Sequence, residues 1–271
     1  MKASVLICLF ILPISIKAQD SVILNTIGIE FRKVLPGSFY LGAYSPTASA
    51  VGFFSQQDEP QNDSILQVAK LLSKQSSKPG FEVKVQHAFY IGVYEISQLE
   101  WQKIMKTNPS KFGQAYLGKN TDDHPVETVS WRDCKKFIAR LNKRERGKFK
   151  YRLPSEIEWE YAARGGKKED ISWQEIWNTA VIGKQEPTIQ GSKNANAYGL
   201  FDMLGNVWEW VEDRYNEKIF AEQYPSQFTN EHVIKGACFY GDVKNATYMT
   251  HAGAKGKRYD IGFRLILEKV N

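Results

Sequence analysis

The chain has 271 residues, of which 42% are hydrophobic, 24% charged and 13% aromatic. These values exclude a disordered chain, a collagen-like fibre and a disulfide-dense mini-protein. The formal charge of +6 is modest for this length and does not indicate nucleic-acid binding. Seven Trp, 13 Tyr, 15 Phe and 20 Gly favour short strands and packed loops over a helical bundle.

The N-terminus has the pattern of a secretory signal peptide. A basic start at Lys2 precedes an apolar run from Val5 to Ile14, and Ala18 is a small residue at a possible cleavage site. The run is too short to span a bilayer, which needs about 20 apolar residues. We therefore expect residues 1–18 to be removed, which lowers the formal charge to +4 because Lys2 and Lys17 are lost. The mature protein is then periplasmic, outer-membrane-associated or extracellular.

The N-terminal third alternates strand signals with one long insertion. Residues 29–42 predict two short strands joined by a Pro-Gly turn, and strand character returns at residues 81–94. Between them, residues 45–80 are rich in Ser, Gln, Pro and Ala, and only residues 65–72 are helix-like. This stretch is expected to be a surface insertion rather than a linker between domains.

Three helices are predicted from their starts. Ser97, Ser130 and Ser155 each precede a carboxylate by three residues, which is the capping-box pattern. After residue 167 regular signals become sparse until the strand-like residues 233–240 and 262–267. Few helices, many loops and strands near both ends indicate one α+β domain over residues 19–271.

The cysteines and one basic stretch leave alternatives open. After removal of the signal peptide, only Cys134 and Cys238 remain, either as a disulfide or as two buried or free thiols.

Residues 132–152 hold ten Lys or Arg and two acids. They fit the solvated face of an amphipathic helix followed by a basic loop, or a surface for anions.

Several motifs together resemble the formylglycine-generating-enzyme (sulfatase-modifying factor) family. They are residues 36–42 (PGSFYLG), 89–97 (FYIGVYEIS), 124–131 (HPVETVSW), 152–166 (RLPSEIEWEYAARGG), 196–210 (NAYGLFDMLGNVWEW) and 262–265 (GFRL). The resemblance runs from about residue 29 to 267. It implies a loop-rich variant of the C-type-lectin-like fold, with a few helices.

The resemblance also identifies where the family's copper ligands belong. Active members bind copper through two cysteines, and those positions fall here at Gly241 and Ala246, whereas Cys238 stands where serine is usual. Copper is therefore not supported, because neither residue has a side-chain ligand. Iron is also disfavoured, since the four histidines show no HxH or HxxxH spacing: His87, His124, His232 and His251. A metal-dependent oxidase or oxygenase with other ligands remains the alternative, so enzyme activity stays open.

Calcium is the cofactor that the resemblance favours. The family's second calcium site corresponds to Asp202, the carbonyls of Gly205 and Val207, and Glu209. Two carboxylates and two carbonyls on one tight loop suit Ca²⁺ if the chain curls at Gly205. The alternative is a loop held by carboxylate–amide hydrogen bonds without a metal.

A non-oxidase binding or envelope-assembly module is the function expected. Family precedents are envelope proteins of secretion and motility machineries and lectin-like variable proteins. In the latter, residues between 235 and 262 form the ligand face. The candidates here are Phe239, Tyr240, Asp242, Asn245, Tyr248, His251 and Tyr259, with Asp260. Aromatic and small polar groups on a rigid support suit a protein or cell-surface ligand.

Overall fold

The computed structural model describes residues 22–43, 80–167, 173–216, 228–242 and 246–270. The predicted signal peptide, nearly all of the predicted insertion and Asn245 lie outside these residues. Within them, no helix is both long and apolar enough to cross a membrane.

The central element is a five-stranded antiparallel sheet that unites both ends of the described chain. Its order is β1 (Val22–Leu24), β2 (Glu30–Val34), β5 (Phe89–Gly92), β11 (Ile266–Lys269) and β6 (Phe149–Arg152). The register aligns Lys33, Tyr90, Leu267 and Tyr151 in one row across four strands. The outer edge of β6 is covered, because the side-chain amide of Asn142 bonds both the N–H and the carbonyl of Tyr151.

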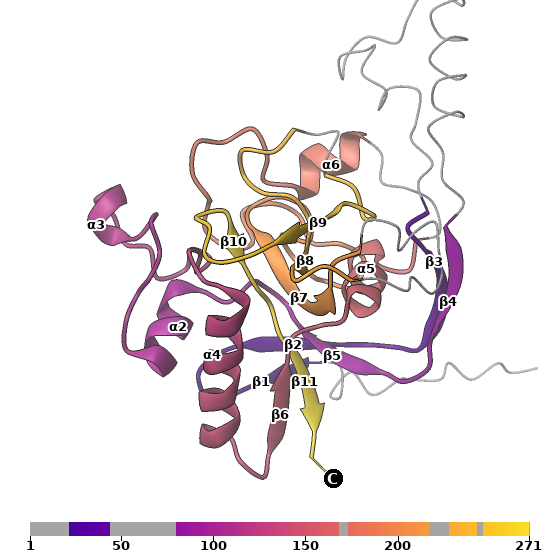
Figure 1. Cartoon of the computed structure of the whole chain (residues 1–271), viewed down its shortest axis with the longest axis horizontal. Coiled ribbons are helices and arrows are strands. Elements are labelled where there is room, and N and C mark those ends of the chain that lie inside the picture. The colour runs from indigo at the N-terminus through magenta and orange to yellow at the C-terminus, as the bar shows by residue number, and fades with distance from the viewer. Residues whose placement is uncertain (1–21, 44–79, 168–172, 217–227, 243–245, 271) are drawn as a thin grey trace, which may run out of the picture.

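The two strands predicted within residues 29–42 exist, but they belong to different sheets. β3 (Gly37–Leu41) pairs with β4 (Phe81–Val85) in a two-stranded sheet that lies beyond the end of β2 and β5 (Figure 1). The chain changes sheets at Leu35 and Pro36. Gly37 is required there, because a Cβ would lie 2.3 Å from the hydroxyl of Tyr161.

All three predicted helices form and begin at their capping boxes. They are α2 (Gln98–Met105), α4 (Trp131–Arg144) and α5 (Glu156–Arg164), and in each the serine hydroxyl accepts a hydrogen bond from the N–H three residues later. Two further helices were not predicted: α3 (Gln114–Leu117) is a single turn, and α6 (Trp173–Thr179) lies where sequence signals are sparse. Local capping thus located the longer helices.

A second sheet of four strands includes the end of the 196–210 motif and the start of the 262–265 motif. Its order is β10 (Ile261–Gly262), β7 (Trp208–Arg214), β8 (His232–Lys235) and β9 (His251–Ala254), with β10 parallel to β7. The strand predicted over residues 233–240 ends at Lys235, because Gly236 and Ala237 adopt positive φ angles of 95° and 68°. The strand predicted over 262–267 is likewise divided into β10 and β11.

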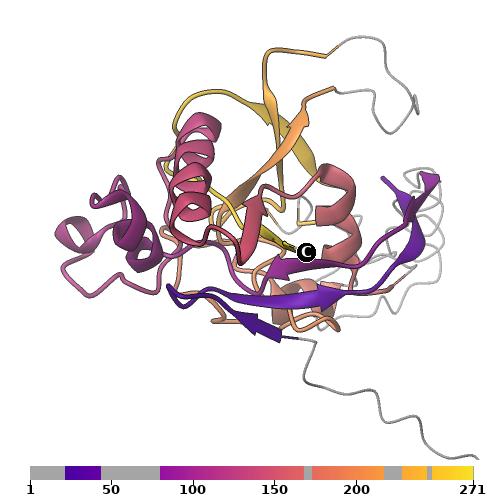
Figure 2. The same cartoon turned by 90° about the horizontal axis from the view of Figure 1, so that it is seen from below.

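Two apolar cores hold these layers together. One lies between the five-stranded sheet and α2 and α4, where Trp101 stacks on Phe137 at 5.4 Å between ring centroids. The other surrounds α5, which contacts both β3–β4 and β7–β8. Seen from below, α4 and α5 stand on the same side of the long β2 and β5 strands (Figure 2). The loop-rich α+β fold expected from the resemblance is therefore confirmed.

Candidate functional site

Residues 202–207 form a tightly curled loop before β7. Asp202, Gly205 and Asn206 have φ angles of 53°, 82° and 53°, so three of six residues are left-handed. At Gly205 a Cβ would lie only 2.2 Å from the carbonyl oxygen of Val181, which makes glycine necessary. The chain therefore curls at Gly205, which is the condition that the expected calcium site requires.

Glu209 is the centre of a buried ion pair. Arg264 donates to both carboxylate oxygens, from Nε to Oε2 at 2.7 Å and from Nη2 to Oε1 at 2.6 Å. The indole Nε1 of Trp159 donates to Oε2 at 2.7 Å. All three side chains are buried. Three family motifs that are distant in sequence thus meet at one carboxylate, and burial makes this bidentate pair sensitive to loss of either partner.

Two neighbouring carboxyls lack a cation of their own. Asp202 accepts the N–H of Gly191 at 2.7 Å through Oδ2, and Glu95 accepts the amide of Asn206 at 3.3 Å through Oε2. Among the described residues, the second oxygen of each is buried without a hydrogen-bond partner. Sequence reasoning missed Glu95 as a site residue, although it begins one of the family motifs (Glu95-Ile96-Ser97).

The pKa values of Glu95 and Asp202 are raised, as expected for buried carboxyls with too little positive charge nearby. Burial, followed by the charges of Asp202 and Glu209, raises the pKa of Glu95 well above its usual value. Burial chiefly raises the pKa of Asp202 to about 6, against the opposing effects of Gly191 and Arg264. Arg264 alone therefore does not neutralise this group of carboxylates, which we call the carboxylate layer: Glu95, Asp202 and Glu209.

The carboxylate layer partly fits the expected calcium ligands. The unpartnered Oδ1 of Asp202 is the kind of hard oxygen that Ca²⁺ takes, and the expected carbonyls of Gly205 and Val207 belong to the same left-handed loop. Glu209 fits less well, because both of its oxygens already accept from Arg264. No three His, Cys, Asp or Glu side chains in the described ranges converge as a metal site. A cation here would therefore depend on Asp202 and backbone carbonyls, with Glu209 shared.

The cysteines lie in separate apolar surroundings. Cys134 is in the core beneath α4, and Cys238 packs with Phe112, Val181 and Phe239; both are free thiols. Burial raises the pKa of Cys238 to about 11 and that of Cys134 well above its usual value. Neither is thus a thiolate at neutral pH. A side chain at Gly241, where the family has a metal ligand, would begin 2.9 Å from the carbonyl of Cys238.

The four histidines lie in different environments. His87 is exposed, and His124 is buried, which lowers its pKa. His232 stacks on Trp131, whereas Nδ1 of His251 lies 3.0 Å from the carboxylate of Glu156. The four histidines thus have different neighbours and do not come together as one group of ligands in the described part of the chain.

The predicted ligand face divides into two groups. Tyr240 and Tyr259 are 46% and 43% exposed and lie together, with a ring separation of 6.1 Å. Asp242 is exposed close to them in sequence, and Phe239 is buried beneath them. Tyr248 and His251 lie elsewhere, beside α5: Tyr248 is buried under the guanidinium of Arg164, and His251 faces Glu156. The structure therefore places the described candidates in two groups, and Asn245 lies outside the described residues.

Residues from another part of the chain complete the exposed group. Phe112 packs edge-on against Phe239 and Tyr116, at 5.3 and 5.5 Å between centroids, and Tyr116 is 64% exposed. Nζ of Lys111 lies 4.3 Å from the ring centroid of Tyr259. We call this surface the aromatic face; its members are Lys111, Phe112, Tyr116, Phe239, Tyr240 and Tyr259. Sequence reasoning missed the first three because α3 and its approach were not predicted.

The aromatic face is held rigidly by a buried carboxylate. Asp260 accepts hydrogen bonds from the hydroxyl of Tyr240 and, at 2.6 and 3.0 Å, from the guanidinium of Arg258. Asp260 is itself buried and adjoins β10. Fixing the ring of Tyr240 in this way lowers the entropy that a ligand must remove on binding.

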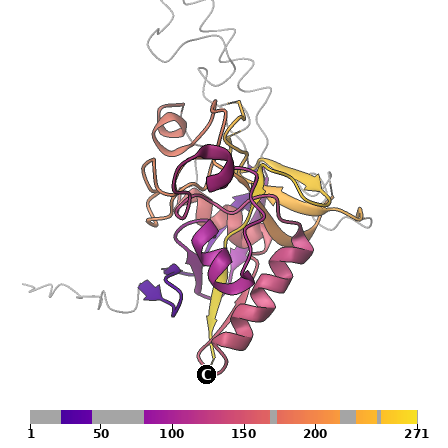
Figure 3. The ribbon, with the colours of Figure 1, turned by 90° about the vertical axis from the view of Figure 1, so that its left-hand side faces the viewer.

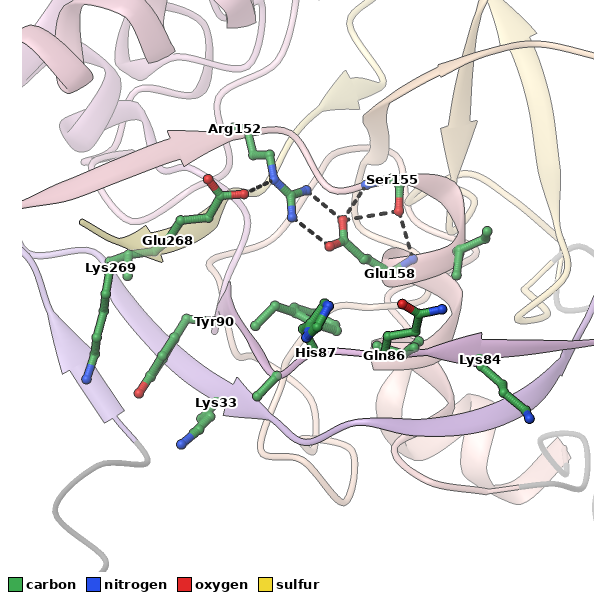
Figure 4. Close-up of a pocket in the computed structure, with 15 residues that line it drawn as sticks. Lys33, Lys84, Gln86, His87, Tyr90, Arg152, Ser155, Glu158, Glu268 and Lys269 are labelled. Carbon is green, nitrogen blue, oxygen red and sulfur yellow. Dashed lines mark hydrogen bonds and ion pairs between the residues drawn. The ribbon is translucent and has the colours of Figure 1, made fainter. Parts of the chain in front are cut away.

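An open groove of about 790 Å³ lies at the end of the five-stranded sheet (Figure 4). Arg152 forms one wall and bonds Glu158 with two 2.6 Å contacts and Glu268 with a third of 2.6 Å. Lys33 and Lys269 project from the opposite rim, beside Tyr90. Arg152 thus pairs with both acids of this groove, Glu268 also lies 3.5 Å from Nζ of Lys150, and the lysines on the rim add positive charge.

Comparison with known proteins assigns the family. Residues 33–269 match the sulfatase-modifying factor enzyme 1-like domain. The chain is 28% identical over 238 residues to chaperone protein LppX of Paenibacillus barcinonensis, covering 67% of this chain and 80% of that protein. It is 25% identical over 257 residues to bovine (Bos taurus) formylglycine-generating enzyme, covering 69% of this chain and 64% of the enzyme.

The fold comparison agrees with the sequence comparison. Treponema denticola variable protein 1 superposes with a TM-score of 0.68 at 21% identity, over 90% of this chain and 98% of that structure. The family match covers most of the chain, including the residues that build the carboxylate layer. The chain belongs to the sulfatase-modifying factor domain family, whose members include the formylglycine-generating enzymes.

Proposed function

We propose that this protein is an exported, non-oxidase binding or assembly module that recognises a protein partner in the cell envelope through its aromatic face. The observation that carries the proposal is the group of half-exposed tyrosines on a rigid, buried support, beside positions that lack the copper cysteines. Tyrosine, phenylalanine and a cation near the rings are typical of interface anchors.

The substitutions at the family's metal positions support a role without copper. Gly241 and Ala246 provide no ligating atoms, and the nearby Cys238 is protonated at neutral pH. The similarity to a protein named as a chaperone provides a precedent for a role other than oxidation. The activity of the bovine enzyme does not transfer on similarity alone, because function depends on site residues.

Site-specific photocrosslinking tests the proposed surface. A benzophenone amino acid is placed at Tyr240 or Tyr259 in the full chain, produced in its native cells, with Tyr40 as the control because it is also exposed and lies on β3. We expect a discrete protein adduct from positions 240 and 259 and none from 40. Equal labelling at all three positions, or no adduct at 240 and 259, would reject the aromatic face as the binding surface.

We further propose that the carboxylate layer binds structural calcium through Asp202, the carbonyls of Gly205 and Val207, and a shared oxygen of Glu209. The supporting observations are the unpartnered Oδ1 of Asp202 and the raised pKa values in the layer. At 100 times its dissociation constant, calcium would add about 2.7 kcal/mol to the free energy of unfolding. This corresponds to a melting temperature higher by roughly 5–10 °C.

Melting in calcium and in chelator measures this stabilisation. We expect Asp202→Asn to abolish the difference, whereas Asp123→Asn, at an exposed acid in a different loop, retains it. If wild type has the same melting temperature in calcium and in chelator, the proposed calcium site is rejected.

A further inference from the structure

A second hollow lies between the N-terminal end of α4 and the four-stranded sheet. Its volume is about 710 Å³, and it is lined by the start of α4, by β7 and β8, and by the residues that follow β9. In Figure 3, α4 runs along the outside of the molecule and its N-terminal end meets β8 and β9. The α4 hollow, as we call it, shares no lining residue with the aromatic face or with the groove of Figure 4.

Two stacked rings give the α4 hollow a fixed wall. The indole of Trp131 lies on the imidazole of His232 with centroids 3.9 Å apart and planes within 12°. The indole Nε1 donates to the carbonyl of Val211 at 3.0 Å, which fixes the ring orientation. Trp131 is partly exposed, so this wall offers apolar contact area with little freedom to move.

Three cations from three different segments line the same hollow. Arg132 comes from α4, Arg214 from the end of β7, and Lys255 from the residue after β9. None of the three forms an ion pair with any residue in the part of the chain that the structure describes. Arg132 begins the basic stretch noted in the sequence, which the proposed function does not use.

The acids beside the α4 hollow are already neutralised by other cations. Both oxygens of Glu212 accept from Lys135 at 2.8 Å. Asp133 caps α4 through Ser130 and lies 3.4 Å from both Lys136 and Lys257. Burial and the charge of Arg214 lower the pKa of His232, which keeps its ring neutral at physiological pH. Within the described ranges, the three cations that line the hollow therefore have no ion-pair partner.

We propose that the α4 hollow binds a small molecule that carries a phosphate monoester. Guanidinium groups bind phosphate oxygens in pairs, and three uncompensated cations match a dianion better than a single carboxylate. The volume lies within the range of small-molecule sites, which leaves space for an organic group against the Trp131–His232 wall. This binding activity is independent of the proposed partner recognition, because the two surfaces share no residues.

Calorimetric titration of the full chain with glucose 6-phosphate tests the site, with glucose and sulfate as comparison ligands. We expect saturable binding of the sugar phosphate, weaker binding of sulfate and none of glucose. Arg132→Gln and Arg214→Gln are each expected to weaken binding roughly tenfold or more, as loss of a charged hydrogen bond does. Equal affinity for sulfate and the sugar phosphate would indicate a general anion site and overturn the proposal.

Control variants separate a defined site from general attraction to a basic protein. Lys84→Gln removes a charge from the groove of Figure 4, and Lys143→Gln removes an exposed charge farther along α4. Both should bind within twofold of wild type. A loss in either control equal to that of Arg214→Gln, or no saturable binding to wild type, would overturn the proposal.

Tryptophan fluorescence locates the ligand independently. We expect the sugar phosphate to change the emission of wild type, because Trp131 lines the hollow, and the change to be much smaller in Trp131→Phe. The buried Trp210 also lines the hollow, so a small residual change is expected, whereas a change of undiminished size in Trp131→Phe would contradict the assignment.

Discussion

The carboxylate layer lies within the family motifs, whereas the aromatic face lies outside them, and the two regions differ in burial and in charge. In the layer, Glu209 and Arg264 are fully buried and bonded to each other, so their residue types are dictated by the fold. On the aromatic face, Tyr240 and Tyr259 are half exposed and the fold does not require their rings. The difference teaches that the motif residues Glu209 and Arg264 belong to the scaffold, whereas the exposed rings outside the motifs are free to vary with the proposed function.

Substitution of Arg264 should give the largest loss of stability, because it leaves Glu209 charged and buried beside two other carboxyls. We expect Arg264→Met to reduce the free energy of unfolding by about 3–5 kcal/mol. Lys135→Met, which breaks an exposed pair with Glu212, should cost less than about 1 kcal/mol. Urea unfolding measures both.

A double variant keeps this prediction testable if Arg264→Met does not fold. Arg264→Met combined with Glu209→Gln removes the unpaired charge and should recover part of the loss. If Arg264→Met lowers the free energy of unfolding no more than Lys135→Met does, the ion pair between Glu209 and Arg264 is not essential to the fold.

The pH dependence of stability distinguishes Asp202 with and without calcium. Its pKa of about 6 exceeds the ordinary value of 3.8, so the folded state binds more protons between these values, and stability falls as pH rises through this range. In chelator, wild type should lose roughly 2–3 kcal/mol from pH 4 to pH 7 relative to Asp202→Asn.

Calcium should change this pH dependence of stability, because it stabilises the ionised carboxylate of Asp202. With calcium present, the relative loss between wild type and Asp202→Asn should disappear or change sign. Parallel stability profiles for the two proteins in chelator would show that Asp202 is not perturbed by the layer.

Substitutions on the aromatic face should have the smallest effect on stability. Tyr259→Ser removes a half-exposed ring and should change the free energy of unfolding by less than about 1 kcal/mol. Tyr240→Ser also removes a hydrogen bond to the buried Asp260 and should cost about 1–2 kcal/mol, because Arg258 still pairs with that carboxylate. Urea unfolding checks this alongside the crosslinking experiment. A loss comparable to that of Arg264→Met would mean that the face is part of the scaffold.

The sequence predicted the features that depend on local chemistry. Capping boxes located α2, α4 and α5 at the residues where these helices begin. The contact of Glu209 with Arg264 joins residues 55 positions apart, and no local pattern specifies it. The resemblance therefore identified the motifs, but only the fold showed which side chains meet.

Local sequence also did not show which of the predicted ligand-face residues lie together. Tyr248 and His251 are close to Tyr240 in sequence, yet Tyr248 lies against Arg164 and His251 against Glu156, both on α5. Phe112 and Tyr116 lie more than 120 residues earlier and still contact the face directly or through each other. Sequence proximity was thus a poor guide where loops separate the strands.

An oxidase assay tests the central claim, that this family member acts without copper chemistry, most directly. The purified full chain is incubated with copper(I), dialysed, and mixed with a sulfatase-type peptide containing its target cysteine, with an active formylglycine-generating enzyme assayed in parallel. We predict that copper is lost on dialysis and that mass spectrometry detects no aldehyde product. Stoichiometric retention of copper with conversion of the cysteine to formylglycine would contradict the account.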